Sequence, residues 1–151
     1  MQSIKQRLAH FNVPAHLIEL EITETAIMDD EEFGISVLQA LSALGISLSI
    51  DDFGTGYSSL GYLQRFPVNK LKIDQSFVRN MATDTRDQAL VLSICQLAKN
   101  LGLDIIAEGV EEHAQLEKLK EYNCDLIQGY LLSRPIPANE FEAFLAKGVS
   151  F

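Results

Sequence analysis

Short apolar runs alternate with longer segments of helical periodicity along the chain, and this alternation predicts the order of its elements. In 46–51, apolar residues occupy every second position, and Ser47, Ser49 and Asp51 occupy the positions between them. A period of two is typical of a β-strand with one face turned to a core. Comparable runs predict strands at 17–23, 70–74, 104–108 and 126–131. We therefore expect five strands.

Helical periodicity fills much of the sequence between these runs. Two segments, 31–44 and 85–101, carry apolar stripes made of Ile35, Leu38, Leu41 and Leu44, and of Leu90, Ile94, Leu97 and Leu101. Gly45 and Gly102 follow these segments and are expected to end the two helices. Further helices are predicted for the first dozen residues, for 111–121 and from about Asn139, where Glu142 suggests a capping box. The alternation favours a parallel sheet with crossover helices.

The predicted strands also segregate their polar residues. Glu19 and Glu21 share one face of the first strand, and Lys70, Lys72 and Asp74 share one face of the third. If the apolar faces meet the helices, the polar faces must meet one another. A closed parallel barrel offers such an inner face.

Composition limits the class of protein. The chain has 151 residues, 47% of them hydrophobic, which suits one folded domain. Its 12 basic and 21 acidic residues give a net charge of −9, which argues against binding of nucleic acid polymers through a basic surface. No apolar run approaches the roughly 20 residues of a membrane span, and Cys95 and Cys124 lack metal-site or disulfide spacing. We expect a soluble cytoplasmic protein.

Functional groups recur where the predicted strands end. The residues at or near the carboxyl ends are Glu21, Asp51, Lys72, Glu108 and Gln128. Asp52 follows at once, and the connecting loops bring Glu24 and Glu111. The carboxyl ends of parallel strands form the rim at which barrels and open α/β sheets carry their sites. We expect these side chains to gather at one rim.

Such a gathering predicts a cation. Two carboxylates about 4 Å apart repel by about 4 kcal/mol at an effective dielectric near 20. Either their pKa values rise or a divalent cation neutralises them, and hard oxygen ligands favour Mg²⁺, Mn²⁺ or Ca²⁺. Two such ions suit in-line phosphodiester hydrolysis, and a neighbouring lysine can orient the attacking water or a phosphate oxygen.

Each residue taken alone has a plainer interpretation. A charged residue at the end of a strand is usually a solvated entry to a loop. The pair Asp51 and Asp52, followed by a glycine-containing stretch, also fits an ordinary acidic turn. Lys72 is harder to explain in this way, because a buried ammonium needs a partner. Cys95 is expected in the core.

Five segments resemble one known family. They read LIELEITET (17–25), DDFGTGYSSL (51–60), FPVNKLKID (66–74), IIAEGVE (105–111) and DLIQGYLLSRP (125–135). In order and spacing they resemble the EAL-domain family of cyclic di-GMP phosphodiesterases. The resemblance implies an α/β fold of the TIM-barrel-like, modified β/α barrel type, with a two-metal site for Mg²⁺ or Mn²⁺.

The resemblance also implies roles for individual residues. It puts Glu21, Asp51 and Asp52 on metal-ligand positions, with Asp51 bridging the two ions, and Lys72 on the lysine that assists the water. Glu108 and Gln128 match later acidic and amide positions of the site. Glu24 and Glu111 match supporting glutamates. The remaining implied residues belong to the loop that links metal binding to dimerisation, namely Phe53, Gly54, Thr55 and Gly56.

Two family features are absent from this sequence. The Glu-Ala-Leu tripeptide, whose glutamate is a metal ligand, does not occur, and Asn12 does not match the asparagine ligand of the family. A complete barrel has eight strands in about 250 residues, against five strand signals here. We therefore expect residues 1–151 to form the C-terminal portion of an EAL domain. Asn69 also replaces the more usual aspartate before the KLKID stretch.

The incomplete pattern carries two expectations. An open barrel exposes two sheet edges, so we expect self-association or pairing with a complementary N-terminal segment. Because two ligands are absent, hydrolysis by this chain should be severely reduced. The resemblance also implies diguanylate cyclase or sensor domains in the parent protein.

Three classes of function follow. The first is hydrolysis of cyclic di-GMP to linear pGpG. The second is a non-catalytic module that binds the dinucleotide or a partner protein. The third is a phospho-receiver domain, which also combines an acidic pair with a lysine in five α/β units. The receiver fold puts its acidic pair after the first strand, whereas here the pair follows the second predicted strand.

Overall fold

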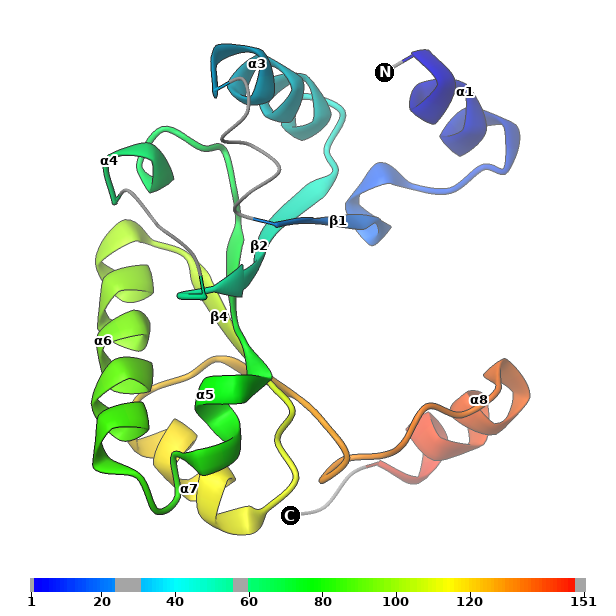
Figure 1. Cartoon of the computed structure of the whole chain (residues 1–151). Coiled ribbons are helices and arrows are strands. Elements are labelled where there is room, and N and C mark those ends of the chain that lie inside the picture. The colour runs from blue at the N-terminus through cyan, green and yellow to red at the C-terminus, as the bar shows by residue number, and fades with distance from the viewer. Residues whose placement is uncertain (1, 24–30, 56–59, 149–151) are drawn as a thin grey trace.

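The computed structural model describes residues 2–23, 31–55 and 60–148 (Figure 1). Its strands are β1 (Glu19–Thr23), β2 (Ser47–Phe53), β3 (Lys70–Ile73), β4 (Asp104–Glu108) and β5 (Leu126–Gln128). Its α-helices are α1 (Gln2–His10), α3 (Glu31–Ser42), α4 (Leu60–Leu63), α5 (Gln75–Asn80), α6 (Thr85–Leu101), α7 (His113–Glu121) and α8 (Ala138–Lys147). A short 3₁₀ helix, η1 (Ala15–Leu17), precedes β1. The five predicted strands and the predicted strand–helix order are confirmed.

The strands form one parallel sheet in the order β1-β2-β3-β4-β5, so each strand pairs with the next along the chain. This order is that of a β/α barrel wall. The register opposes Glu21 to Ser49 and Ser49 to Lys70, and farther along it opposes Glu108 to Gln128. The polar residues of successive strands therefore share one face, as the alternation predicts. Within the described residues, β1 and β5 are the edges of the sheet.

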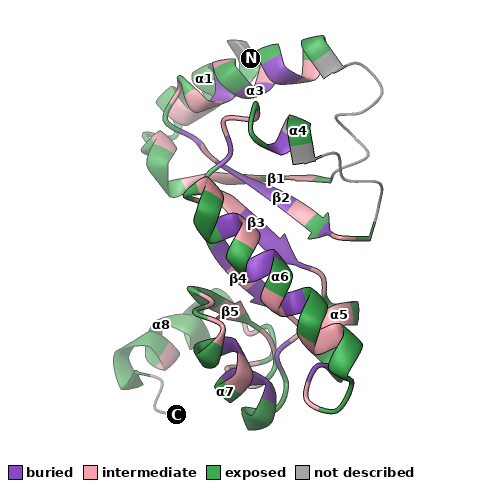
Figure 2. Ribbon diagram, turned by 90° about the vertical axis from the view of Figure 1, so that its left-hand side faces the viewer, coloured by how far each residue is buried: buried purple, intermediate pink, exposed green. Residues whose placement is uncertain are grey.

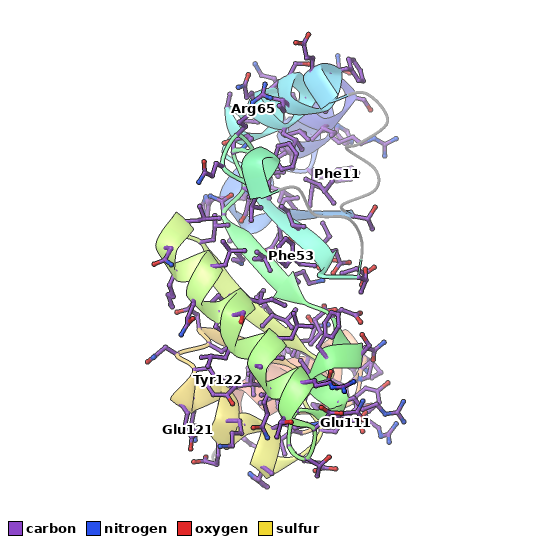
Figure 3. All side chains as sticks on the ribbon, turned by 60° about the vertical axis from the view of Figure 1, so that its left-hand side comes forward. Phe11, Phe53, Arg65, Glu111, Glu121 and Tyr122 are labelled. Atoms are coloured by element: carbon purple, nitrogen blue, oxygen red, sulfur yellow. The ribbon has the colours of Figure 1, made fainter. Side chains whose placement is uncertain are left out.

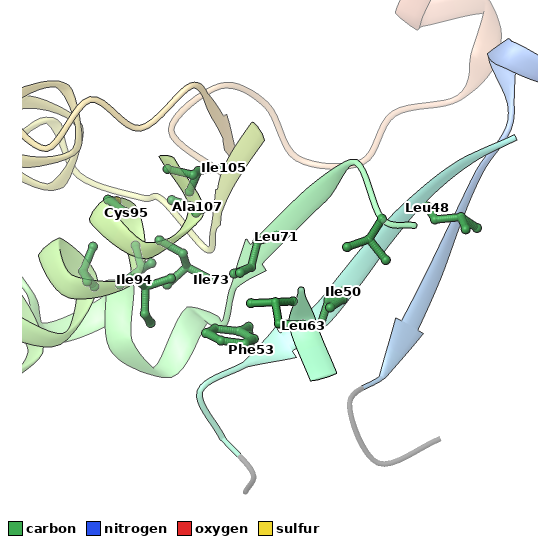
Figure 4. Packing of buried hydrophobic residues seen from close by; sticks show 14 of the residues in the cluster. Leu48, Ile50, Phe53, Leu63, Leu71, Ile73, Ile94, Cys95, Ile105 and Ala107 are labelled. Carbon is green, nitrogen blue, oxygen red and sulfur yellow. The ribbon is translucent and has the colours of Figure 1, made fainter. Parts of the chain in front are cut away.

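The opposite face of the sheet carries the core. Leu48, Leu71, Ile73 and Ile105 are fully buried there (Figure 4). Figure 1 shows α3, α4 and α6 along this side of the sheet, and Ile4 and Leu8 of α1 pack against the same core. The interior thus separates an apolar layer under the helices from a polar inner face.

The buried stripe of α6 differs from the prediction. Its buried residues are Val91, Ile94, Cys95 and Ala98, whereas Leu90 is 37% exposed and Leu97 and Leu101 are half-buried. Only Ile94 of the predicted stripe is buried. Small side chains let this helix lie close to β3 and β4, and the larger leucines fall at the border of the contact. The expected burial of Cys95 is confirmed.

The helix ends follow the predictions in part. Gly102 ends α6 in the left-handed conformation, with φ +70°, and Gly45 follows α3 with φ +83°. The capping box predicted at Asn139 is wrong. The helix α8 begins at Ala138 after Pro137, whose side chain has no acceptor, and Asn139 lies inside the first turn. The short elements η1, α4 and α5 were not predicted, because so few residues carry no readable period.

The strand predicted at 126–131 ends at Gln128. The chain then turns around Val110 of the loop after β4. The Val110 N–H donates to Gln128 O at 3.1 Å, and the Leu131 N–H donates to Val110 O at 3.0 Å. A β-carbon on Gly129 would lie 2.1 Å from Val110 O, so this crossing requires glycine.

None of the helices in the described part of the chain is long and apolar enough to cross a membrane. The last helix, α8, has no buried residue (Figure 2). Its side chains Phe141 and Leu145 are about half exposed or more.

The Gly129 crossing can be tested by substitution. Gly129→Ala should lower the free energy of unfolding by about 3 kcal/mol, because the added carbon meets the Val110 backbone. Gly102→Ala is the matched control. It meets no atom within 4 Å and bears only the left-handed strain of about 1 kcal/mol. Urea unfolding measures both, and equal losses would contradict the crowding argument.

Candidate active site at the carboxyl rim of the sheet

Lys72 lies at the centre of the polar inner face. It is 3% exposed, because β3 is flanked by strands on both sides. Its Nζ atom lies 2.6 Å from Glu21 Oε1, 3.0 Å from Asp51 Oδ1 and 2.7 Å from Glu108 Oε1. One ammonium therefore joins carboxylates from β1, β2 and β4, the three strands around it. The predicted convergence of these four residues is present.

An irregularity in β2 brings the adjacent acids together. In a regular strand, neighbouring side chains point to opposite faces. The register between β2 and β3 shifts between Ile50 and Phe53, and Asp52 has φ +53°. A bulge of this kind re-aims the side chains it contains. Asp51, Asp52 and Glu108 consequently bring one carboxylate oxygen each to within 4.8 Å of one another.

Charge is unevenly balanced at this rim. Burial lowers the pKa of Lys72, but its close contacts with three carboxylates outweigh burial and raise that pKa above its usual value. Burial and the neighbouring charge of Asp51 raise the pKa of Asp52. Burial also raises the pKa of Asp74, but hydrogen bonds from Ser76 outweigh it and leave that pKa lowered. The carboxylates exceed the single ammonium, so the rim attracts a further cation.

The donor set fits a hard divalent cation. Asp51, Asp52 and Glu108 offer only carboxylate oxygens, the ligands that Mg²⁺, Mn²⁺ and Ca²⁺ prefer. Asp51 Oδ1 is buried and makes no well-directed hydrogen bond, although it lies within ion-pair distance of Lys72. A cation would satisfy this oxygen and relieve the repulsion that raises the pKa of Asp52.

A groove of about 750 Å³ adjoins the acidic cluster. Glu108 belongs to both, and Glu111 and Gln128 also line the groove. Its lining also includes Tyr130 and Arg134, with the guanidinium carbon 4.5 Å from the centre of the tyrosine ring. Arg134 supplies the positive charge in the described lining of the groove. The site therefore combines an acidic rim with an adjoining pocket whose lining includes a stacked tyrosine and arginine.

The structure brings most of the predicted site residues to this one rim. Glu21, Asp51, Asp52, Lys72 and Glu108 form the cluster, and Glu111 and Gln128 lie in the groove. Glu24 and Gly56 lie outside the described residues.

The residues predicted to form a loop after β2 take three different environments. Phe53 is the last residue of β2 and is 5% exposed in the core, because the bulge extends the strand beyond Asp51. Figure 3 shows Phe53 inside the fold and Glu111 at its surface. Gly54 follows with φ +96°, and the Thr55 hydroxyl donates to Asp52 O at 2.8 Å. Phe53 thus anchors the chain from which this turn departs.

The sequence predictions did not assign Asp74, Tyr130 or Arg134 to the site. Asp74 caps α5 by accepting the Ser76 N–H at 2.9 Å, and its carboxylate neighbours that of Asp52. Its place on the polar face of the strand predicted at 70–74 was a usable signal. Tyr130 and Arg134 follow the end of β5, where no strand period indicates a direction.

Parallel strands, a buried lysine and carboxylates at the carboxyl rim define a β/α-barrel-type protein with an acidic site whose donor atoms suit a divalent cation. The chain matches the EAL domain over residues 1–135, and it belongs to that family. The domains of this family have a TIM-barrel-like fold, as the sequence resemblance implies. Membership in the family removes the phospho-receiver alternative.

Three comparisons support the assignment. The chain is 49% identical over 139 residues to the bifunctional diguanylate cyclase/cyclic di-GMP phosphodiesterase MucR of Pseudomonas aeruginosa, covering 92% of this chain and 20% of that protein. It superposes on the structure of the MucR phosphodiesterase in complex with c-di-GMP with a TM-score of 0.89, at 44% identity, over 93% of this chain and 57% of the other. A manganese/cyclic di-GMP complex of Klebsiella pneumoniae BlrP1 gives a TM-score of 0.82 at 35% identity, over 89% and 34% of the two chains. The chain thus spans about a fifth of the length of MucR.

The buried ion pairs of Lys72 should stabilise the fold. Lys72→Met leaves carboxylates on three strands without their shared cation, and it should lower the free energy of unfolding by about 3 kcal/mol. Lys70→Met is the matched control. Lys70 shares the face but has one partner, Glu19, and both side chains are more than a fifth exposed, so its loss should be about 1 kcal/mol. Urea unfolding without divalent ions compares the two, and a Lys72→Met variant as stable as wild type would contradict the interpretation.

Proposed function

We propose that residues 1–151 form the C-terminal portion of an EAL domain that binds c-di-GMP and hydrolyses it to linear pGpG. The observation that carries the proposal is the acidic cluster around Lys72, open to a groove through Glu108. MucR and BlrP1 were both solved in complex with cyclic di-GMP. They are similar to this chain over most of its length.

In this proposal, Asp51, Asp52 and Glu108 hold Mg²⁺ or Mn²⁺, and Glu21 completes the acidic rim through Lys72. Divalent ions bound there would stabilise charge on the phosphate and activate water. Lys72 has three N–H donors and three carboxylate partners. A carboxylate that turned from Lys72 to a cation would leave the ammonium better placed to donate to water or to a phosphate oxygen.

The groove suits a dinucleotide with two phosphates. A guanine base can stack on Tyr130, and Arg134 can pair with a phosphate or stack in turn. Gln128 offers an amide that can donate and accept hydrogen bonds beside Glu111. The acidic rim alone would repel the ligand, so binding should depend on the divalent ion.

Hydrolysis by this chain alone should be slow. The sheet has five strands in the described residues, whereas a barrel of this type closes with eight. Closure of the barrel would need strands beyond these five, which would also supply further ligands and exclude water. A diguanylate cyclase or sensor domain in the parent protein belongs to the same proposal, as does a cytoplasmic location, which suits the two free cysteines.

One observation favours a non-catalytic binding module as the second candidate. Lys72 already pairs with three carboxylates, so it competes with a cation for Asp51 and Glu108. A chain in which the lysine wins this competition would hold the dinucleotide in the groove without cutting it.

Asp51→Asn tests the cation site. It removes one negative charge at the buried oxygen, and it should weaken Mn²⁺ binding by at least about tenfold, measured by electron paramagnetic resonance of free Mn²⁺. Asp104→Asn is the matched control, because Asp104 is an exposed acid at the start of β4, at the opposite end of that strand from the rim that carries Glu108. Mn²⁺ affinity unchanged by Asp51→Asn would remove the basis of the proposed site.

Chromatography of c-di-GMP incubated with the chain and Mn²⁺ separates the two candidates. Slow formation of pGpG that Asp51→Asn abolishes supports the hydrolase. Saturable c-di-GMP binding in calorimetry without any product supports the binding module instead. No binding and no product would contradict both.

The sheet edges β1 and β5 and the exposed apolar side chains of α8 predict association, either between copies of the chain or with a complementary N-terminal segment. Size-exclusion chromatography with light scattering should give a mass above 16.8 kDa for the chain by itself or in the presence of that segment. The double variant Phe141→Glu/Leu145→Glu should shift the mass toward the monomer, because both side chains are exposed and apolar. Glu142→Gln on the same helix is the control. A monomer under all conditions would refute the idea.

A further inference from the structure

The Gln115 side chain is buried at a distance from the inner face of the barrel. It is 3% exposed and is one of three buried polar side chains in the described part of the chain, the other two being Ser49 and Lys72 on the sheet. Burying an amide is costly unless its hydrogen bonds are made. Gln115 makes four, which indicates a built contact rather than a chance burial.

These hydrogen bonds join two segments. The Gln115 Oε1 atom accepts the N–H groups of Glu111 at 2.8 Å and Glu112 at 2.9 Å, just before α7. Its Nε2 atom donates to Val78 O at 3.2 Å and to Arg79 O at 3.3 Å, near the end of α5. One amide therefore ties the loop after β4 to the helix after β3.

The loop after β4 is held from its other side as well. Val110 exchanges backbone hydrogen bonds with Gln128 and Leu131, and Gly129 lies against its backbone. A β-carbon on Gly109 would lie 2.6 Å from Gln75 Cβ, so the loop also packs closely on the start of α5. Residues 109–112 have little freedom between these two contacts.

Both segments carry acids of the site. The loop begins after Glu108, which contacts Lys72, and it includes Glu111, which lines the groove. The helix α5 begins after Asp74, whose carboxylate neighbours Asp52. A shift of α5 relative to the loop would change the spacing of these acids, and Gln115 opposes that shift.

We propose that Gln115 is a positioning residue of the candidate active site. It fixes the loop 109–112 against α5, so that Glu108 and Glu111 keep their places relative to Asp52 and Asp74. The inference rests on the proposed function, because it assigns the effect to cation binding at that site. An amide serving only as a helix cap would need no contact with Val78 or Arg79.

Gln115→Met tests the inference, because it keeps the length of the side chain and removes all four hydrogen bonds. Amide hydrogen exchange followed by nuclear magnetic resonance should be at least tenfold faster at Glu111 and Glu112 than in wild type. Mn²⁺ affinity, followed by electron paramagnetic resonance, should fall about tenfold, as is usual when the support of a metal ligand is lost.

Leu119→Ala is the matched control, since Leu119 is buried on the same helix and has no polar contact to lose. It should change Mn²⁺ affinity less than twofold. Faster exchange in Gln115→Met with unchanged Mn²⁺ affinity would overturn the positioning role.

Amide hydrogen exchange in the wild-type chain tests the inference without any variant. Glu111 and Glu112 amides that exchange as fast as exposed ones would overturn the inference even if Gln115→Met did not fold. If the wild-type chain bound no Mn²⁺, the cation site and the positioning role assigned to it would both fail. Protected amides at Glu111 and Glu112 would still show that Gln115 holds the loop 109–112 against α5. The two failures are therefore distinguishable.

Discussion

The pairing of one buried ammonium with carboxylates from three strands governs this structure. Lys72 is almost completely excluded from water, so its charge is tolerated only because Glu21, Asp51 and Glu108 surround it. Because all three carboxylates must reach the same Nζ atom, Glu21, Asp51 and Glu108 lie at the same level along β1, β2 and β4. It also leaves the rim with more negative charge than one lysine neutralises. Stability and cation attraction therefore arise from the same group of side chains.

Parallel pairing in sequence order turns this local contact into a site. Each strand adds its polar residues one step farther around the inner face, and each crossover helix covers the outer face. The groove then forms where the chain leaves β5 and crosses Val110. Its residues come from the start of α5, the end of β4 and the loop after it, β5 and the segment that follows, and α8, so no single motif contains it.

The sequence predicts those features that repeat at short range. Alternation in 46–51 and the charges of 70–74 identify strands, faces and the meeting of Lys72 with its acids. The sequence does not predict the bulge at Asp51 and Asp52, because a register shift is a property of two paired strands. The buried stripe of α6 depends likewise on how closely that helix approaches the sheet. Two hydrogen-bond partners of Gln115, Val78 and Arg79, lie 37 and 36 residues away, too far for a local sequence pattern to indicate.

The left-handed backbone of Asp52 restricts which residues the chain can hold there. At φ +53°, a branched or bulky side chain would clash with the adjacent backbone. Glycine, asparagine and aspartate adopt this left-handed conformation at lower cost than other residues. Of these three, aspartate alone brings a negative charge. Backbone conformation and charge therefore favour the same amino acid independently. A single-base change to a valine or alanine codon would both strain the backbone and remove the negative charge.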